Sequence, residues 1–160
     1  MSGRSIVYYY SRTGNTKRIA EQIAATLGGD IEALQDAVEY SGAVGFFKAG
    51  RDAFRSAVHE IAPLAHPPAA YDLVIVGQPV WAARPVPAVN GLLGNYDLSG
   101  RKVALFVTFD GGGDAHCLEA TEAHLKAGQV VAKASFLKVG KKPEENLKKA
   151  QQWAESLRPM

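Results

Sequence analysis

Hydrophobic positions along the chain change period several times, from short apolar runs to repeats of about four residues. The runs predict five buried strands, at residues 6–10, 31–34, 73–76, 103–108 and 130–137. The repeats predict helices between the strands. The first helix carries Ile19, Ile23 and Leu27 on one face, and Gly28 with Gly29 ends it. Later helices are expected at 85–93, at 115–126 and from Pro143 onward.

Residues 36–70 have the weakest pattern in the chain. A helix face is compatible with the spacing of five apolar residues there: Ala43, Phe46, Phe47, Phe54 and Val58. Two roles stay open for the part between Tyr40 and Arg55. We favour a crossover helix packed on the sheet, and the alternative is a segment that covers a ligand or forms a dimer surface.

Strands that alternate with helices predict an α/β fold, because right-handed crossovers place helices on both faces of a parallel sheet. We expect one domain over residues 1–160, a three-layer α/β/α sandwich around a five-stranded parallel sheet of order 2-1-3-4-5. Ligands of such sheets bind beyond the carboxyl ends of the strands, where the winding direction reverses. The loops at 11–16, 77–83 and 109–114 should therefore meet at one crevice.

The first of these loops, SRTGNT, has the chemistry of a phosphate site. A helix N-terminus leaves about four backbone N–H groups unpaired and attracts anions. The loop adds hydroxyl, glycine and amide positions, at Ser11, Thr13, Gly14, Asn15 and Thr16. It lacks the Gly-Lys-Ser/Thr ending of a P-loop and the GxGxxG fingerprint of dinucleotide-binding proteins. A cysteine-dependent phosphatase loop is also excluded, because the one cysteine, Cys117, lies outside this loop. The loop would therefore hold a phosphate without cleaving it. The alternative is that Ser11 or Thr13 merely caps the helix.

The other two loops offer an aromatic ring and bare backbone. The loop GQPVWAARP places Trp81 just beyond a strand end, where its indole suits a planar heteroaromatic ligand. A packing role is the commoner use of a single tryptophan. The loop TFDGGGDAH exposes N–H and C=O groups that can reach the edge of a ring. A flexible turn in which Asp114 caps the next helix is the alternative there.

Composition excludes several classes of protein. A net charge of +2 is too small to indicate a nucleic-acid surface. No apolar run approaches the roughly 20 residues of a membrane span. The opening MSGRSIVYYY passes directly into a strand pattern, so we expect cytoplasmic residence. The single cysteine, Cys117, forms no internal disulfide and has no ligand-spaced partners, so no metal site is expected.

The three motifs, in this order and spacing, resemble the flavodoxin-like FMN-binding family over nearly the whole chain. The resemblance implies FMN as the cofactor and no catalytic side chain. Its phosphate would be held by Ser11, Arg12, Thr13, Gly14, Asn15 and Thr16. One side of the flavin ring would be lined by Pro79, Val80, Trp81, Ala82 and Ala83. The pyrimidine edge and other side would be approached by Thr108, Phe109, Asp110, Gly111, Gly112 and Gly113.

Three departures from the family pattern matter. Many relatives have glycine after the aromatic residue, where a backbone rearrangement helps to stabilise half-reduced flavin. This chain has Ala82 and Ala83, for which a positive φ is costly. The stacking tyrosine of the third loop is absent, unless a phenylalanine replaces it, the candidates being Phe46, Phe47 and Phe109. Classical members are strongly acidic, whereas this chain has a pI of about 8.7.

The resemblance leaves two main functions open. The first is electron transfer through a non-covalently bound flavin, and the second is an NAD(P)H-dependent FMN/quinone oxidoreductase that transfers hydride. His116 and His59 are candidate proton donors for the enzyme, although surface solvation is the commoner role of such a histidine. Arg84 could attract an acidic acceptor or the phosphate of a nicotinamide cofactor, although surface solvation is the commoner role of such a residue. The partner would be a redox protein or a small acceptor such as a quinone, and a homodimer stays open. A binding module without flavin is the third class.

Overall fold

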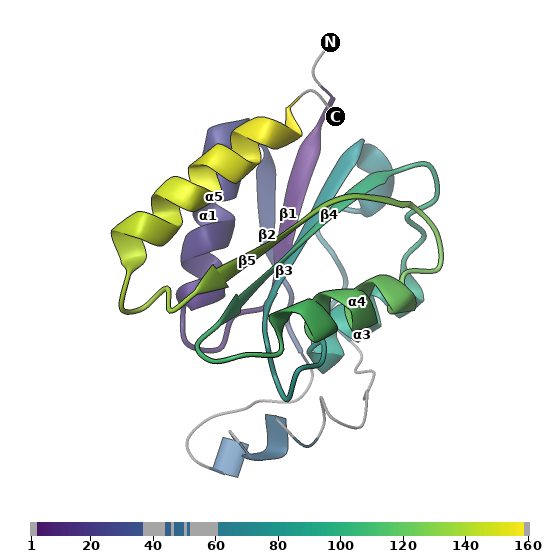
Figure 1. The fold of residues 1–160 in the computed structure, drawn as a ribbon. Coiled ribbons are helices and arrows are strands. Elements are labelled where there is room, and N and C mark those ends of the chain that lie inside the picture. Colours follow the sequence, from purple (N-terminus) through teal and green to yellow (C-terminus); the bar gives the residue numbers. More distant parts are fainter. Residues whose placement is uncertain (1–2, 37–43, 46, 50, 52–60, 159–160) are drawn as a thin grey trace.

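The computed structural model describes residues 3–36, 44–45, 47–49, 51 and 61–158 (Figure 1). The strands are β1 (Ser5–Tyr9), β2 (Asp30–Ala33), β3 (Leu73–Pro79), β4 (Lys102–Phe109) and β5 (Gln129–Leu137). The helices are α1 (Asn15–Leu27), the short 3₁₀ turn η1 (Pro68–Ala70), α3 (Pro87–Asn95), α4 (Asp114–His124) and α5 (Pro143–Leu157). Each of the five predicted strands occurs, within two or three residues of its expected ends.

All neighbouring strands pair in parallel, and the sheet order is β2-β1-β3-β4-β5. This is the predicted three-layer α/β/α architecture with its predicted strand order. Because the strands are parallel, the carboxyl ends of β1, β3 and β4 lie at the same edge. The chain reverses its winding between β1 and β3, so the loops after these strands flank the switch point.

Two hydrophobic cores lie on opposite faces of the sheet, because successive side chains of a strand point to opposite sides. Ile6 and Tyr8 of β1 face the core beneath α3 and α4, whereas Val7 and Tyr9 face the core beneath α1 and α5. Figure 1 shows α1 and α5 together on one side and α3 and α4 on the other. Nowhere in the described ranges does a helix have both the length and the apolar character to cross a bilayer.

Helix ends follow from local chemistry. Helix α1 is flanked by Gly14 and Gly28, both with left-handed backbones (φ 98° and 65°), which glycine adopts without steric cost. Helix α3 begins at Pro87, slightly later than the expected residue 85. The reason is visible one residue earlier, where the Val86 N–H donates to Gln78 Oε1 at 2.8 Å and Val86 stays extended.

Hydrogen bonds to the Glu32 side chain of β2 hold Ala65 and His66, which come shortly before β3, against the sheet. One oxygen of Glu32 accepts the Ala65 N–H at 2.9 Å, and the other accepts the His66 N–H at 2.8 Å. His66 Nδ1 lies 3.0 Å from the same carboxylate, and the Tyr8 hydroxyl donates to the His66 carbonyl. Most of the expected helix face between 43 and 58 lies outside the described residues, so the crossover helix stays a prediction.

The packing of β3 against β4 can be tested at Gly77. A Cβ at this position would lie 1.9 Å from Phe106 Cζ, because the ring of the paired residue on β4 leans over the glycine. We expect Gly77→Ala to lower the free energy of unfolding by about 3 kcal/mol, as overpacking in a closed core does. Chemical denaturation measures this loss.

Gly94 of α3 provides the matched control. A Cβ there meets nothing within 4 Å, so Gly94→Ala should leave stability unchanged or raise it by up to about 1 kcal/mol. Equal stability of the two variants would contradict the packing account.

Candidate functional site

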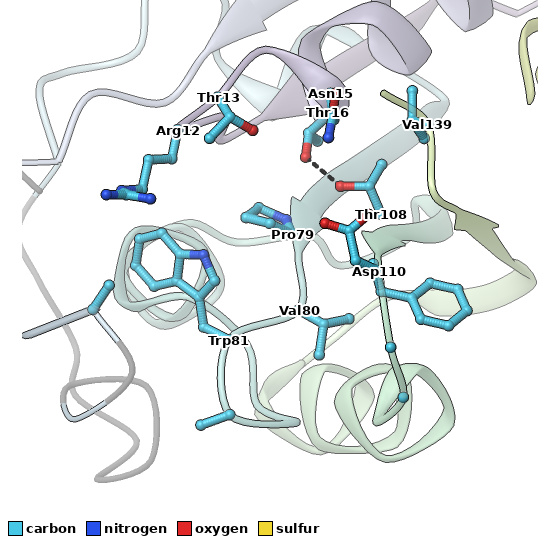
Figure 2. Close-up of a pocket in the computed structure, with 15 residues that line it drawn as sticks. Arg12, Thr13, Asn15, Thr16, Pro79, Val80, Trp81, Thr108, Asp110 and Val139 are labelled. Carbon is cyan, nitrogen blue, oxygen red and sulfur yellow. Dashed lines mark hydrogen bonds between the residues drawn. The ribbon is translucent and has the colours of Figure 1, made fainter. Parts of the chain in front are cut away.

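A cavity of about 570 Å³ opens at the carboxyl edge of the sheet, a size typical of small-molecule and cofactor sites. The three predicted loops meet around it (Figure 2). The residues of these loops that line the cavity are Arg12, Thr13, Asn15, Thr16, Pro79, Val80, Trp81, Ala82, Thr108, Phe109, Asp110, Gly111 and Gly112. Four residues of the predicted set are not part of the lining: Ser11, Gly14, Ala83 and Gly113.

The N-terminus of α1 forms one side of the cavity. Hydrogen bonding along this helix begins with Arg18, whose N–H donates to the Gly14 carbonyl at 3.1 Å. The amides of Asn15, Thr16 and Lys17 therefore have no acceptor within the helix. Ser11 stands behind them, because its Oγ accepts the Gly14 N–H at 3.0 Å. Gly14 itself precedes the helix and no side-chain hydrogen bond caps it, so the alternative of a Ser11 or Thr13 cap is wrong.

A buried hydroxyl pair joins the first loop to the third. Thr16 Oγ1 and Thr108 Oγ1 lie 2.8 Å apart, and both residues are almost completely buried (Figure 2). Thr16 belongs to the first turn of α1, and Thr108 lies near the end of β4. The bond fixes the helix N-terminus against the sheet at the back of the cavity.

Trp81 forms the wall opposite the third loop. Its ring is partly buried and packs edge-on against Tyr10, with ring centroids 5.4 Å apart and an interplanar angle of 89°. Burial, reinforced by the Asp36 carboxylate, raises the pKa of Tyr10 to about 12, so this phenol stays neutral at physiological pH. Arg12 lines the same cavity (Figure 2). The indole is therefore held by neutral aromatic packing against Tyr10.

The turn after Trp81 has an unusual backbone. Trp81 and Arg84 form an isolated antiparallel bridge, with the Arg84 N–H donating to the Trp81 carbonyl at 2.9 Å. The two residues between them, Ala82 and Ala83, have φ values of 51° and 60°. The sequence indicated that positive φ is costly for alanine, and the fold nevertheless adopts it twice at this wall of the cavity.

Two lining residues were missed by the sequence reasoning. Val139 follows β5 and is buried at the cavity, where the Lys138 N–H donates to the Phe109 carbonyl at 2.8 Å. Only its position after the strand next to β4 could have indicated it. Ala49 also lines the cavity and is 3% exposed. It lies in the segment between Tyr40 and Arg55, most of which is outside the described residues, so both roles considered for that segment stay predictions.

The structure describes four of the residues for which a proton-donor, ring-stacking or helix-capping role was considered, namely His116, Phe47, Phe109 and Asp114. His116 Nδ1 lies 2.8 Å from the Ala83 carbonyl oxygen, so this exposed histidine is engaged by the second loop. Phe109 lines the cavity, whereas Phe47 is 76% exposed and is not part of the lining. Phe46 and His59 lie outside the described residues. Gly113 precedes α4 with no side-chain cap, so the alternative in which Asp114 caps this helix is wrong.

Cys117, the one cysteine of the chain, is not among the residues that line the cavity. It is fully buried on α4, and burial raises the pKa of its thiol to about 12, which leaves it protonated and unreactive. Among the residues that the structure describes, no three His, Cys, Asp or Glu side chains are grouped to hold a metal ion.

Solved structures of flavoproteins have this fold. A flavoprotein from Bacteroides uniformis superposes with a TM-score of 0.77 at 20% identity, covering 97% of this chain and 99% of that one. A flavoprotein from Lactobacillus acidophilus in complex with FMN gives a TM-score of 0.67 at 21% identity, covering 83% and 93%. A flavodoxin from Fusobacterium nucleatum bound to flavin mononucleotide gives 0.61 at 12% identity, covering 98% of both chains.

Sequence comparison gives the family. No curated protein matches the chain in sequence. The sequence profile of one flavodoxin family, described as Flavodoxin, matches residues 4–157, which is almost the full length of the chain. A match of this extent includes all three loops around the cavity. The chain therefore belongs to the flavodoxin family.

Proposed function

We propose that the chain binds FMN non-covalently in this cavity and transfers electrons through it. One observation carries the proposal: the N-terminus of α1, whose first amides have no acceptor within the helix, and the indole of Trp81 lie on different sides of one cavity of about 570 Å³. A ligand that fits needs a compact anion at one end and a planar apolar body at the other. FMN has both, and the Lactobacillus and Fusobacterium proteins described above are complexes of FMN.

The N-terminus of α1 offers a partial positive charge and hydrogen-bond donors to the phosphate of FMN. The N-terminus of a helix carries a partial positive charge, and its open amides can donate to a phosphate dianion. Thr13 and Asn15 line the same side of the cavity and add a hydroxyl and an amide donor (Figure 2). The charged side chains among the lining residues are Arg12 and Asp110, on the first and third loops. Donors thus exceed acceptors on the α1 side.

The two walls of the cavity beyond α1 have shapes that suit the flat ring of FMN. Trp81 and Val80 supply apolar surface on one wall, and the backbone at Gly111 and Gly112 can approach from the other without side chains in the way. Burial between these walls would exclude water from the ring faces. Bound FMN supplies one- and two-electron redox chemistry, and the protein supplies its position and surroundings. No described side chain has to act as nucleophile or acid for this function.

Asn15→Asp tests the phosphate end. The substitution keeps the shape of the side chain and adds a negative charge beside the proposed dianion, a repulsion of about 1–4 kcal/mol per charge pair at close range. FMN affinity should fall tenfold or more, on the order of that repulsion, whereas affinity for riboflavin, which has no phosphate, should be unchanged. Isothermal titration calorimetry with the two ligands measures both.

Two controls define the result. Gln152→Glu makes the same change of charge on an exposed site of α5 and should leave FMN binding as it is. An acidic residue in the first turn of α1 is favourable for the helix, by about 0.3–1 kcal/mol, so Asn15→Asp should not lower the melting temperature of the free protein. Equal loss of riboflavin and FMN affinity would argue against a phosphate at α1.

A second experiment separates an electron carrier from an NAD(P)H-dependent enzyme. The FMN-loaded protein is mixed with NADH or NADPH, with and without a quinone, and nicotinamide oxidation is followed by absorbance. We expect a rate no higher than that of free FMN, together with rapid reduction by dithionite and reoxidation by a one-electron acceptor such as ferricyanide. Saturable turnover of NADH or NADPH would overturn the carrier proposal in favour of the oxidoreductase.

A further inference from the structure

The wall that carries Trp81 depends on a turn that its own sequence disfavours. The turn at 81–84 has two central residues with positive φ, as type I′ hairpin turns do, and such turns favour Asn-Gly. Ala82 and Ala83 stand there instead, and the left-handed region is unfavourable for each because its Cβ comes too close to the following carbonyl oxygen. One of the two hydrogen bonds across the turn is also long, 3.4 Å from the Trp81 nitrogen to the Arg84 oxygen. The turn therefore needs support from outside.

Helix α4 and the loop before it supply that support at Ala83. His116 Nδ1 lies 2.8 Å from the Ala83 carbonyl oxygen. A carbonyl oxygen only accepts, so the proton of this bond is on Nδ1. Gly113 packs against the same residue, since a Cβ there would lie 2.8 Å from the Ala83 Cβ and 3.0 Å from its Cα. The strained residue is thus held at its carbonyl by a side chain and at its Cβ by bare backbone.

The same helix also holds both ends of the segment that contains the turn. Gln78, at the end of β3, is 1% exposed and donates from Nε2 to Thr121 Oγ1 of α4 at 2.8 Å. Its Oε1 accepts the Val86 N–H at 2.8 Å, on the far side of the turn. The backbone before and after the turn is therefore fixed through one buried amide, and His116 adds the contact at the middle.

We propose that His116 is a positioning residue, which holds the strained turn at 81–84 closed and so keeps Trp81 on the cavity wall before a ligand enters. We call the hydrogen bond from His116 to the Ala83 carbonyl the clamp, and it is present in the free protein. Its consequence for FMN affinity rests on the proposed function, because a preformed wall removes an ordering cost from binding. His116 touches neither the cavity nor, on this proposal, the ligand.

The test uses backbone amide exchange in the free protein, with the Arg84 N–H as reporter, because this group closes the turn by donating to the Trp81 carbonyl. His116→Leu removes the donor and keeps an apolar body of similar size. His116→Asn places an N–H donor the same number of bonds from Cα as Nδ1. We expect exchange at Arg84 to be about threefold to tenfold faster in the leucine variant, as loss of an ordinary hydrogen bond gives, and near wild type in the asparagine variant.

A second pair of variants separates the clamp from general damage to α4. Glu119→Leu changes another exposed residue of the helix and should leave Arg84 exchange unchanged. Ala82→Asn with Ala83→Gly installs the residues that the turn favours, so adding His116→Leu to this pair should no longer accelerate exchange. Unchanged protection in His116→Leu alone would overturn the proposal. Acceleration that persists with Asn-Gly would overturn it too, because backbone strain would not be what His116 opposes.

FMN titration of the same proteins gives the linked prediction. Affinity falls only with the fraction of molecules in which the turn is closed, so His116→Leu should weaken FMN binding by no more than the factor by which it accelerates Arg84 exchange, and His116→Asn should not weaken it. If FMN binds only the closed turn, saturating FMN should also slow Arg84 exchange in the wild type and in His116→Leu. If the wild type failed to bind FMN while the exchange results held, the proposed function would fail and the clamp would stand. Arg84 exchange that saturating FMN leaves unchanged in both proteins would refute the link between turn and site.

Discussion

Parallel pairing of β1, β3 and β4 positions every loop of the proposed site. It brings the ends of three strands to one edge, and the loops that follow them enclose the cavity. The pairing is tight enough for Phe106 of β4 to lie over Gly77 of β3. Any shift of these strands would separate the N-terminus of α1 from Trp81, and with it the two halves of the proposed site.

The architecture could be predicted from the sequence because it depends on periodicity. Apolar runs and four-residue repeats are local patterns, and the parallel sheet follows from their alternation. The strand order does not, because several doubly wound orders share this alternation, and it is the resemblance of the three motifs to the flavodoxin-like family that implies 2-1-3-4-5. The loops of the cavity could be predicted from periodicity, since strand ends mark them. Helix boundaries were less certain where a tertiary bond decides them, as the Gln78 bond to Val86 does at the start of α3.

Other features of the site depend on contacts between distant residues and give no local signal. Val139 reaches the cavity because β5 pairs with β4, and Ala49 reaches it from the segment with the weakest pattern. Ser11 and Gly113 are set behind the lining because they support neighbouring backbone. The positive φ of Ala82 and Ala83 runs against their local preference. It is accompanied by contacts of Ala83 with His116 and Gly113, which lie some thirty residues away in the sequence and give no local signal.

In the proposed complex, the N-terminus of α1 binds the phosphate of FMN and the flavin ring lies beside Trp81. A crystal structure of the chain grown with FMN would show both contacts. We expect phosphate oxygens within hydrogen-bond distance of the Asn15, Thr16 and Lys17 amides, and an isoalloxazine ring between Trp81 and the loop at 109–113. A phosphate bound elsewhere, or a ring that does not contact the Trp81 wall, would contradict this proposal.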